Sequence, residues 1–163
     1  MKKLKIENLT AITDTREQTP FQFKELKTES QTLTTGDYSV AGFEQYICVE
    51  RKSLSDLISC ITTGRERFER ELLRMKSYSK KIVVCEGSWT DIVTGKYRSK
   101  VTPKAVQNSI ISFINRYGVP FHFCGSRVEA AAFTEQFLFD ACKKFHEMCQ
   151  KFDFEKPSAA NPK

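Results

Sequence analysis

Metal-binding spacings are missing from the cysteines and histidines of this 163-residue chain. It has two histidines, and none of its six cysteines belongs to a Cys-x-x-Cys pair. Structural zinc sites use clustered Cys and His ligands at short, regular spacings, so we expect no structural zinc. Cys48, Cys85 and Cys124 fall in apolar runs, where a free thiol packs as a small hydrophobic side chain. The cysteines therefore indicate a reduced, intracellular protein.

Long apolar stretches are missing as well. No segment approaches the roughly 20 apolar residues that cross a bilayer, and residues 1–10 have no apolar core of the signal-peptide kind. We expect no membrane segment and a cytoplasmic location, which means the host cytosol for a viral protein; a eukaryotic source would also permit the nucleus. Internal repeats and a clear linker are absent from the pattern. We expect one domain over residues 1–152 and a flexible C-terminal tail over residues 153–163.

The excess of positive charge is small. The formal net charge is +6 with a pI near 9.0, while 40% of the residues are hydrophobic and 28% are charged. Such a composition is typical of a soluble globular domain and is far less basic than a histone. The charge fits a polyanionic partner but does not identify one.

Hydrophobic periodicity predicts strands in the first part of the chain and alternating helices and strands after it. The expected strands cover residues 9–13, 28–33, 38–41, 45–50, 81–85 and 119–124. The expected helices cover residues 54–61, 65–79, 89–93 and 103–117, and a last one begins near residue 127. In the second helix we expect Leu73 to face the core together with Phe68, Leu72 and Met75. This order indicates an α/β domain with a central mixed sheet flanked by helices.

Three charged residues flank two of the expected strands. Asp37 follows a glycine at a strand entry, and Glu50 and Lys52 stand two residues apart at the end of the apolar run 47–49. Alternate strand residues share a face, so Glu50 and Lys52 point to the same side of the sheet. Two carboxylates and an ammonium suit a hard divalent cation beside a phosphate. Scattered surface charges at strand ends are the alternative interpretation.

Asp56 has a structural explanation of its own. It follows Ser53 by three residues at the start of an expected helix, which is a capping-box spacing. An acid in the first helical turn is stabilising. We therefore expect Asp56 to cap the helix and at most to orient the neighbouring site.

These residues resemble the signature of the XPF-type structure-selective endonucleases. That signature is Gly-Asp, a variable gap, Glu-Arg-Lys, three residues and Asp, here Gly36, Asp37, Glu50, Arg51, Lys52 and Asp56. The segment 14–17, Asp-Thr-Arg-Glu, is similar to the family's Asp-x-Arg-Glu element. Residues 67–75 are similar to its arginine-bearing helix. The resemblance implies a restriction-endonuclease-like fold.

The resemblance also implies roles for individual residues. Catalytic roles would fall to Asp37, Glu50, Lys52 and Arg51, with Lys52 acting on the water that attacks the phosphate. A magnesium or manganese ion would be held by Asp37 and Glu50 with help from Asp14 and Glu17. Phosphates of DNA would be contacted by Arg16, Arg51 and an arginine of the following helix, Arg67 in preference to Arg65.

Two departures from the family pattern stand out. Glu71 replaces a glutamine that is usual in the arginine-bearing helix. The chain also ends without the tandem helix-hairpin-helix module that many relatives carry. The resemblance therefore implies a homodimer through the C-terminal helices, or a partner that supplies grip on DNA.

The segment 96–100 offers a further basic patch. Lys96, Arg98 and Lys100 surround one tyrosine. They fit contact with a phosphate backbone, and an ordinary exposed basic loop is an equal alternative.

The function predicted from the sequence is that of a metal-dependent DNA endonuclease. Its substrates would be branched, flapped or forked DNA in repair, recombination or replication, and the compact size favours a phage or mobile element as the source. The alternative is a catalytically silent DNA-binding or dimer-partner subunit. Silent members of the family typically lose the Asp and Glu-Arg-Lys residues, and this chain retains them.

Overall fold

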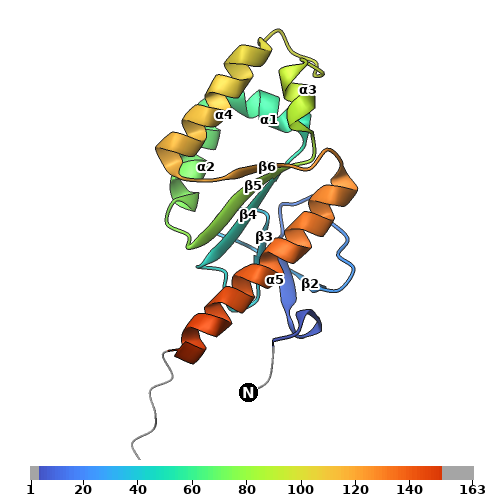
Figure 1. Ribbon diagram of the computed structural model, residues 1–163, viewed down its shortest axis with the longest axis vertical. Helices are drawn as coiled ribbons and strands as arrows, with labels where there is room; N and C mark the ends of the chain where they lie inside the picture. The colour runs from blue at the N-terminus through green and yellow to red at the C-terminus, as the bar shows by residue number, and fades with distance from the viewer. Residues whose placement is uncertain (1–3, 152–163) are drawn as a thin grey trace, which may run out of the picture.

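The sheet has six strands, in the spatial order β2-β1-β3-β4-β5-β6 (Figure 1). The computed structural model describes residues 4–151, so the predicted tail, residues 153–163, lies outside the described residues. The strands are β1 (Thr10–Asp14), β2 (Lys27–Gln31), β3 (Tyr38–Val40), β4 (Ile47–Lys52), β5 (Lys80–Cys85) and β6 (Phe121–Phe123). Strand β3 runs antiparallel to β1 and β4, whereas the pairs β1–β2, β4–β5 and β5–β6 are parallel. The mixed sheet confirms the predicted fold class.

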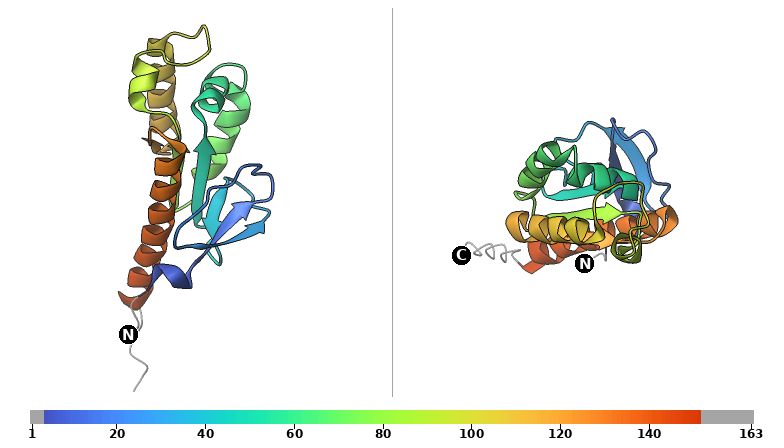
Figure 2. Two further views of the ribbon diagram at one scale, coloured as in Figure 1. Left: turned by 90° about the vertical axis from the view of Figure 1, so that its right-hand side faces the viewer. Right: turned by 90° about the horizontal axis from the view of Figure 1, so that it is seen from above.

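Helices pack on the sheet in two groups. They are α1 (Leu54–Ile61), α2 (Arg65–Met75), α3 (Trp89–Val93), α4 (Pro103–Tyr117) and α5 (Arg127–Lys151), and a 3-10 turn, η1 (Ile6–Asn8), precedes β1. Figures 1 and 2 show α1 to α4 gathered at one end of the molecule and α5 lying along the strands. Within the described residues, no helix has the length and apolarity needed to cross a membrane.

The alternation of β4 divides the hydrophobic core into two clusters. Ile47 and Val49 belong to the cluster that includes Leu138 of α5, whereas Cys48 belongs to the cluster that includes Leu57 of α1 and Phe68 of α2. By the same alternation, Glu50 and Lys52 share the face of Cys48, and Arg51 lies on the opposite face. Three consecutive charged residues therefore enter two different environments.

Local capping sets the helix beside this strand end. The Ser53 hydroxyl accepts a hydrogen bond from the Asp56 N–H (3.1 Å) and donates one to the Asp56 carboxylate (2.7 Å). These bonds satisfy helix-start groups that would otherwise lack partners. The cap predicted for Asp56 is therefore present.

The second helix differs from its prediction. Helix α2 ends at Met75 rather than near residue 79, because the chain turns at residues 76–79 so that β5 begins beside Ile47. Leu73, which we expected to face the core, is 59% exposed. Phe68, Leu72 and Met75 are spaced by four and three residues and already form the buried stripe, and Leu73 lies off that stripe.

Candidate active site

A cavity of about 400 Å³ lies between the ends of β1 and β4, the segment 34–37 and α2. Its lining gathers half of the residues predicted for the site, namely Asp14, Arg16, Asp37, Glu50, Lys52 and Arg67. Thr34, Thr35, Gly36, Cys60, Phe68, Glu71 and Arg74 complete the lining. We refer to it as the Asp37 cavity.

The backbone fixes the position of Asp37. Its N–H donates to the Val49 carbonyl and its carbonyl accepts from the Asp14 N–H, both at 2.8 Å. Gly36, just before it, has φ +82°, and a Cβ there would lie 2.5 Å from the Cys48 Sγ. Only glycine meets both constraints. The Asp37 carboxylate also accepts a hydrogen bond from the backbone N–H of Arg51 at 2.8 Å, which holds the carboxylate beside the end of β4.

Glu50 is the buried carboxylate of the cavity. Its side chain is 4% exposed, one oxygen bonds to the Lys52 ammonium, and the other, Oε2, is buried without a hydrogen-bond partner. Burial, reinforced by the charge of Asp37, raises the pKa of Glu50 well above its usual value. Burial likewise raises the pKa of Asp37 to about 6. A buried oxygen without a donor is costly, and a bound cation would satisfy it. The donor set of Asp37 and Glu50 therefore fits a hard divalent ion.

Lys52 supplies the positive charge. Besides Glu50, its Nζ lies 4.0 Å from the Glu71 carboxylate and 5.4 Å from the centre of the Phe68 ring. Burial opposes its charge, but the carboxylates of Glu50 and Glu71 outweigh burial and raise the pKa of Lys52. Lys52 is therefore an ammonium in the free protein. Glu71, the departure from the family's glutamine, faces this ammonium.

The carboxylate of Asp14 is hydrogen-bonded to donors of the protein itself. Its carboxylate accepts the Arg16 Nε (2.6 Å) and Nη2 (3.1 Å) and the N–H groups of Arg16 (2.9 Å) and Leu33 (2.7 Å). Burial opposes the charge, but these bonds hold the pKa of Asp14 below its usual value. Asp14, predicted as a helper ligand of the metal, thus anchors Arg16 at the cavity rim. The Arg16 side chain itself is 67% exposed, as a phosphate contact requires.

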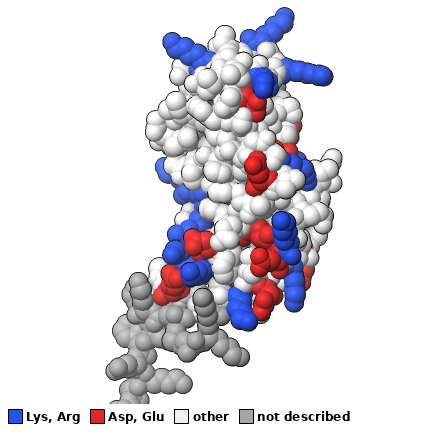
Figure 3. All heavy atoms as spheres, turned by 45° about the vertical axis from the view of Figure 1, so that its right-hand side comes forward, with Lys and Arg blue, Asp and Glu red and all other residues white. Residues whose placement is uncertain are grey.

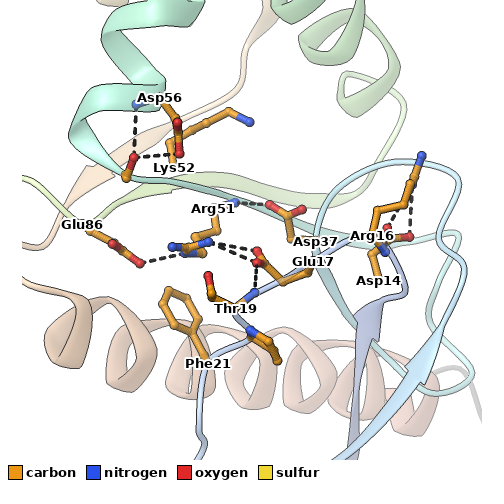
Figure 4. Close-up of polar contacts among 12 residues, drawn as sticks. Asp14, Arg16, Glu17, Thr19, Phe21, Asp37, Arg51, Lys52, Asp56 and Glu86 are labelled. Atoms are coloured by element: carbon orange, nitrogen blue, oxygen red, sulfur yellow. Dashed lines mark hydrogen bonds and ion pairs between the residues drawn. The ribbon is translucent and has the colours of Figure 1, made fainter.

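Arg51 and Glu17 lie on the other face of β4, in a set of residues that we call the Arg51 cluster (Figure 4). The Arg51 Nη1 bonds both Glu17 oxygens (3.1 and 3.2 Å), and its Nε bonds Glu86 at 2.7 Å. Arg127 of α5 also donates to Glu86 at 2.7 Å. Both guanidinium groups lie over the Phe21 ring, at 5.6 Å for Arg51 and 5.1 Å for Arg127.

In the Arg51 cluster, the contacts of Arg51 and Glu17 are with other residues of the protein. Arg51 was predicted to contact phosphate and Glu17 to help bind metal, yet their side chains are only 14% and 7% exposed and they bond to each other. Glu17 also accepts the Thr19 N–H at 2.9 Å. Sequence reasoning missed Glu86 and Arg127. The available signal for Glu86 was an acid directly after the apolar run of β5.

The metal ligands predicted from the resemblance are thus divided. Asp37 and Glu50 line the Asp37 cavity, and the Asp14 carboxylate accepts four hydrogen bonds from the protein. Glu17 is paired with Arg51, and both line a neighbouring cavity together with Asp37. Within the part of the chain that the structure describes, no three His, Cys, Asp or Glu residues come together as a metal-binding group. Arginines, backbone N–H groups and Lys52 compensate the charges of these carboxylates.

The arginines of α2 separate in the same way. Arg67, which the sequence analysis preferred to Arg65 as the phosphate contact, is exposed and lines the cavity. Arg65 bonds Glu69 (3.0 Å) and the Ser109 hydroxyl (3.1 Å), which holds it between α2 and α4. Arg74, which was not predicted, lines the cavity and donates to the Thr35 hydroxyl at 3.3 Å.

The basic segment 96–100 lies apart from the Asp37 cavity. It forms the loop between α3 and α4, at the end of the molecule where Lys and Arg side chains project in Figure 3. Lys96, Arg98 and Lys100 are exposed, and Lys96 lies 4.0 Å from Asp91.

Comparisons with known proteins agree with this fold. A model of the ERCC4 domain matches residues 10–137. One solved structure, XPF from Aeropyrum pernix, has a TM-score of 0.64 and 18% identity, over 87% of this chain and 69% of that chain. XPF from Aeropyrum pernix in complex with DNA has a TM-score of 0.62 and 18% identity, over 91% of this chain and 68% of that chain. No curated protein matches the sequence.

Proposed function

The chain belongs to the ERCC4 domain family, and from this premise we propose that it is a metal-dependent DNA endonuclease acting on branched, flapped or forked DNA. The observation that carries the proposal is the Asp37 cavity, where Asp37 and the buried Glu50 lie beside the Lys52 ammonium. The unpartnered Oε2 of Glu50 adds the chemical need for a cation. The likeness to XPF in complex with DNA supports DNA as the substrate.

We propose that Asp37 and Glu50 hold Mg²⁺ or Mn²⁺. Such an ion, when bound, polarises a phosphoryl oxygen and makes a stronger nucleophile of water. Both carboxylates must be ionised to bind it. Burial raises the pKa of Asp37 to about 6 and that of Glu50 well above its usual value, so metal binding should strengthen as the pH rises.

The remaining residues of the cavity act on the phosphate. The Lys52 ammonium offsets negative charge that grows on the phosphoryl oxygens, a preorganised electrostatic role. Arg16 and Arg67 stand at the rim, where exposed guanidinium groups can orient the DNA backbone. The Arg51 cluster holds residues 17–21 against α5 and so supports the segment that carries Arg16.

The test is cleavage of labelled single-stranded, duplex, flap and forked DNA with Mg²⁺, Mn²⁺ or EDTA. We expect metal-dependent cutting by the wild type and none by Asp37→Asn. Asp56→Asn is the matched control, because it removes a neighbouring carboxylate that serves the helix cap. Retained cutting by Asp37→Asn would remove Asp37 from the metal site. Binding without cutting on every substrate would support the silent-subunit alternative.

The predicted homodimer through the C-terminal helices stays a proposal of the same kind. It is tested by light scattering of the purified protein across a range of concentrations. A monomer at all concentrations would contradict it, without bearing on the assignment of the cavity.

A further inference from the structure

Three cavities adjoin one another through shared lining residues. The Asp37 cavity adjoins a cavity of about 600 Å³ that lies along α1; the residues that line both are Arg16, Asp37, Lys52, Cys60 and Arg67. That second cavity shares Ser55 and Ser59 with a third, of about 500 Å³, which lies between α1 and the loop 96–99. A continuous path therefore leads from Glu50 and Lys52, across α1, to Lys96 and Arg98. We call it the α1 path.

Where the path crosses α1, the helix surface carries short side chains with hydroxyl groups. Leu57, Ile58 and Ile61 point into the core, so Ser55, Ser59 and Thr62 form the outer surface of α1. Serine is short, so a bulky chain can pass close to the helix there. Hydroxyl groups contact phosphate oxygens in protein–DNA complexes without reading sequence. The Ser59 hydroxyl bonds the Ser55 carbonyl at 3.1 Å in this structure, and a hydroxyl can turn to another acceptor.

Cationic groups stand at both ends of the path. Arg16, Lys52 and Arg67 line the end at the Asp37 cavity, and Lys96 and Arg98 line the far end. The acid beside the crossing, Asp56, is engaged by the Ser53 hydroxyl at the N-terminus of α1, where the helix dipole offsets its charge. At the cavity end, Asp37 and Glu17, the latter paired with Arg51, also line the path. The far end is cationic, and the serine hydroxyl groups between the two ends are neutral.

We propose that the α1 path carries the strand being cut, on one side of the scissile phosphate, and that the loop 96–100 grips its backbone. This inference rests on the proposed function. The diameter of an α-helix is about 10–12 Å, and each nucleotide of a B-form strand advances about 3.4 Å. The loop therefore contacts phosphates three to four nucleotides from the cut.

The first experiment measures binding without cutting. Affinity for a flapped DNA is measured in EDTA at 50–200 mM salt for the wild type and for Lys96→Ala/Arg98→Ala/Lys100→Ala. The slope of log K against log salt is negative, and each lost phosphate contact reduces its magnitude by about 0.7–0.9. Losing three contacts should therefore reduce the magnitude by about 2–3. The control is Lys27→Ala/Lys143→Ala/Lys144→Ala, which has the same net charge and changes only residues outside the path. Its slope should equal that of the wild type.

The second experiment locates the strand. Ser59→Cys is mixed with DNA that bears a thiol tether at one to ten nucleotides on either side of the cut. We expect disulfide cross-linking on one side of the cut only, nearer to it than the three to four nucleotides at which the loop contacts the strand. Wild type is the control, because Cys149 is exposed and sets the background.

The outcomes separate the two proposals. Wild type that neither binds nor cuts DNA would overturn the proposed function. Wild type that cuts, together with an unchanged salt slope in the loop variant or no cross-link at Ser59→Cys above background, would overturn the α1 path alone. A thermal unfolding curve for each variant shows that the loss is not one of folding.

Discussion

Replacing Arg51 by alanine distinguishes a buried structural arginine from a phosphate contact. Its guanidinium bonds Glu17 and Glu86, and all three side chains are 16% exposed or less. Removing one partner of a buried ion pair costs about 3–5 kcal/mol, because the other charge stays buried without compensation. Glu86 would retain Arg127, whereas Glu17 would retain only the Thr19 N–H. We therefore expect a loss of about 3 kcal/mol, at the lower end of the range.

The assay is urea unfolding in EDTA, followed by circular dichroism. For an m value of about 2 kcal/mol/M, the expected midpoint shift is about 1.5 M. In a domain of this size, the same loss lowers the melting temperature by about 6–12 °C. Arg67→Ala is the matched control, since that exposed arginine lines the cavity rim and its loss should change stability by less than about 0.5 kcal/mol.

An unchanged urea midpoint in Arg51→Ala would refute this reasoning. Such a result, combined with a lower salt slope of DNA binding, would return Arg51 to the phosphate contact implied by the family resemblance. Arg51→Lys keeps the charge but loses the two-sided hydrogen bonding. It should fall between the wild type and Arg51→Ala.

Three further predictions concern the Asp37 cavity. Burial raises the pKa of Asp37 from 3.8 to about 6, so the folded state holds its proton more tightly than the unfolded state. In EDTA, the ionisation of Asp37 therefore makes the protein less stable as the pH rises from about 4 to about 6. Asp37→Asn should remove that part of the pH dependence of the urea midpoint. Identical pH profiles of the wild type and the variant would contradict the assignment. Lys52→Ala should lower the cleavage rate by about 10²–10³-fold, because an electrostatic contact with the transition state is lost. The affinity for Mn²⁺, measured by electron paramagnetic resonance, should change little. A parallel loss of Mn²⁺ affinity would mean that Lys52 only orders the site. Gly36→Ala should destabilise the folded protein by more than about 2 kcal/mol. The positive φ alone costs alanine about 1–2 kcal/mol, and the added Cβ would lie 2.5 Å from the Cys48 Sγ. A melting temperature equal to that of the wild type would show that the loop relaxes.

Local patterns predicted the elements that place the site. The apolar run before Glu50, the Ser53 cap and the glycine before Asp37 each depend on neighbours within a few residues, which is the range that periodicity and capping rules describe. Asp37, Glu50 and Lys52 consequently meet in one cavity, as predicted.

The charge partners were beyond the reach of such patterns. Arg51 meets Glu17 and Glu86 across 34 and 35 residues, and Glu86 meets Arg127 across 41. Strand alternation places Arg51 on the face opposite Lys52, but its partners there come from distant parts of the chain. Asp14 shows the same limit, because Leu33, one of its donors, comes from a loop 19 residues away.

Lys52 gives the cavity a resident counterion. A buried carboxylate that is balanced by a lysine of its own strand needs no added ion to keep the fold neutral. In zinc fingers, by contrast, metal binding supplies the free energy of folding. For this protein a chelator should silence the site and leave the chain folded, lowering the melting temperature only by the stabilisation that the bound ion supplies. The lysine thereby lets the chain fold without metal, so that metal supply would switch activity on and off in a chain that stays folded.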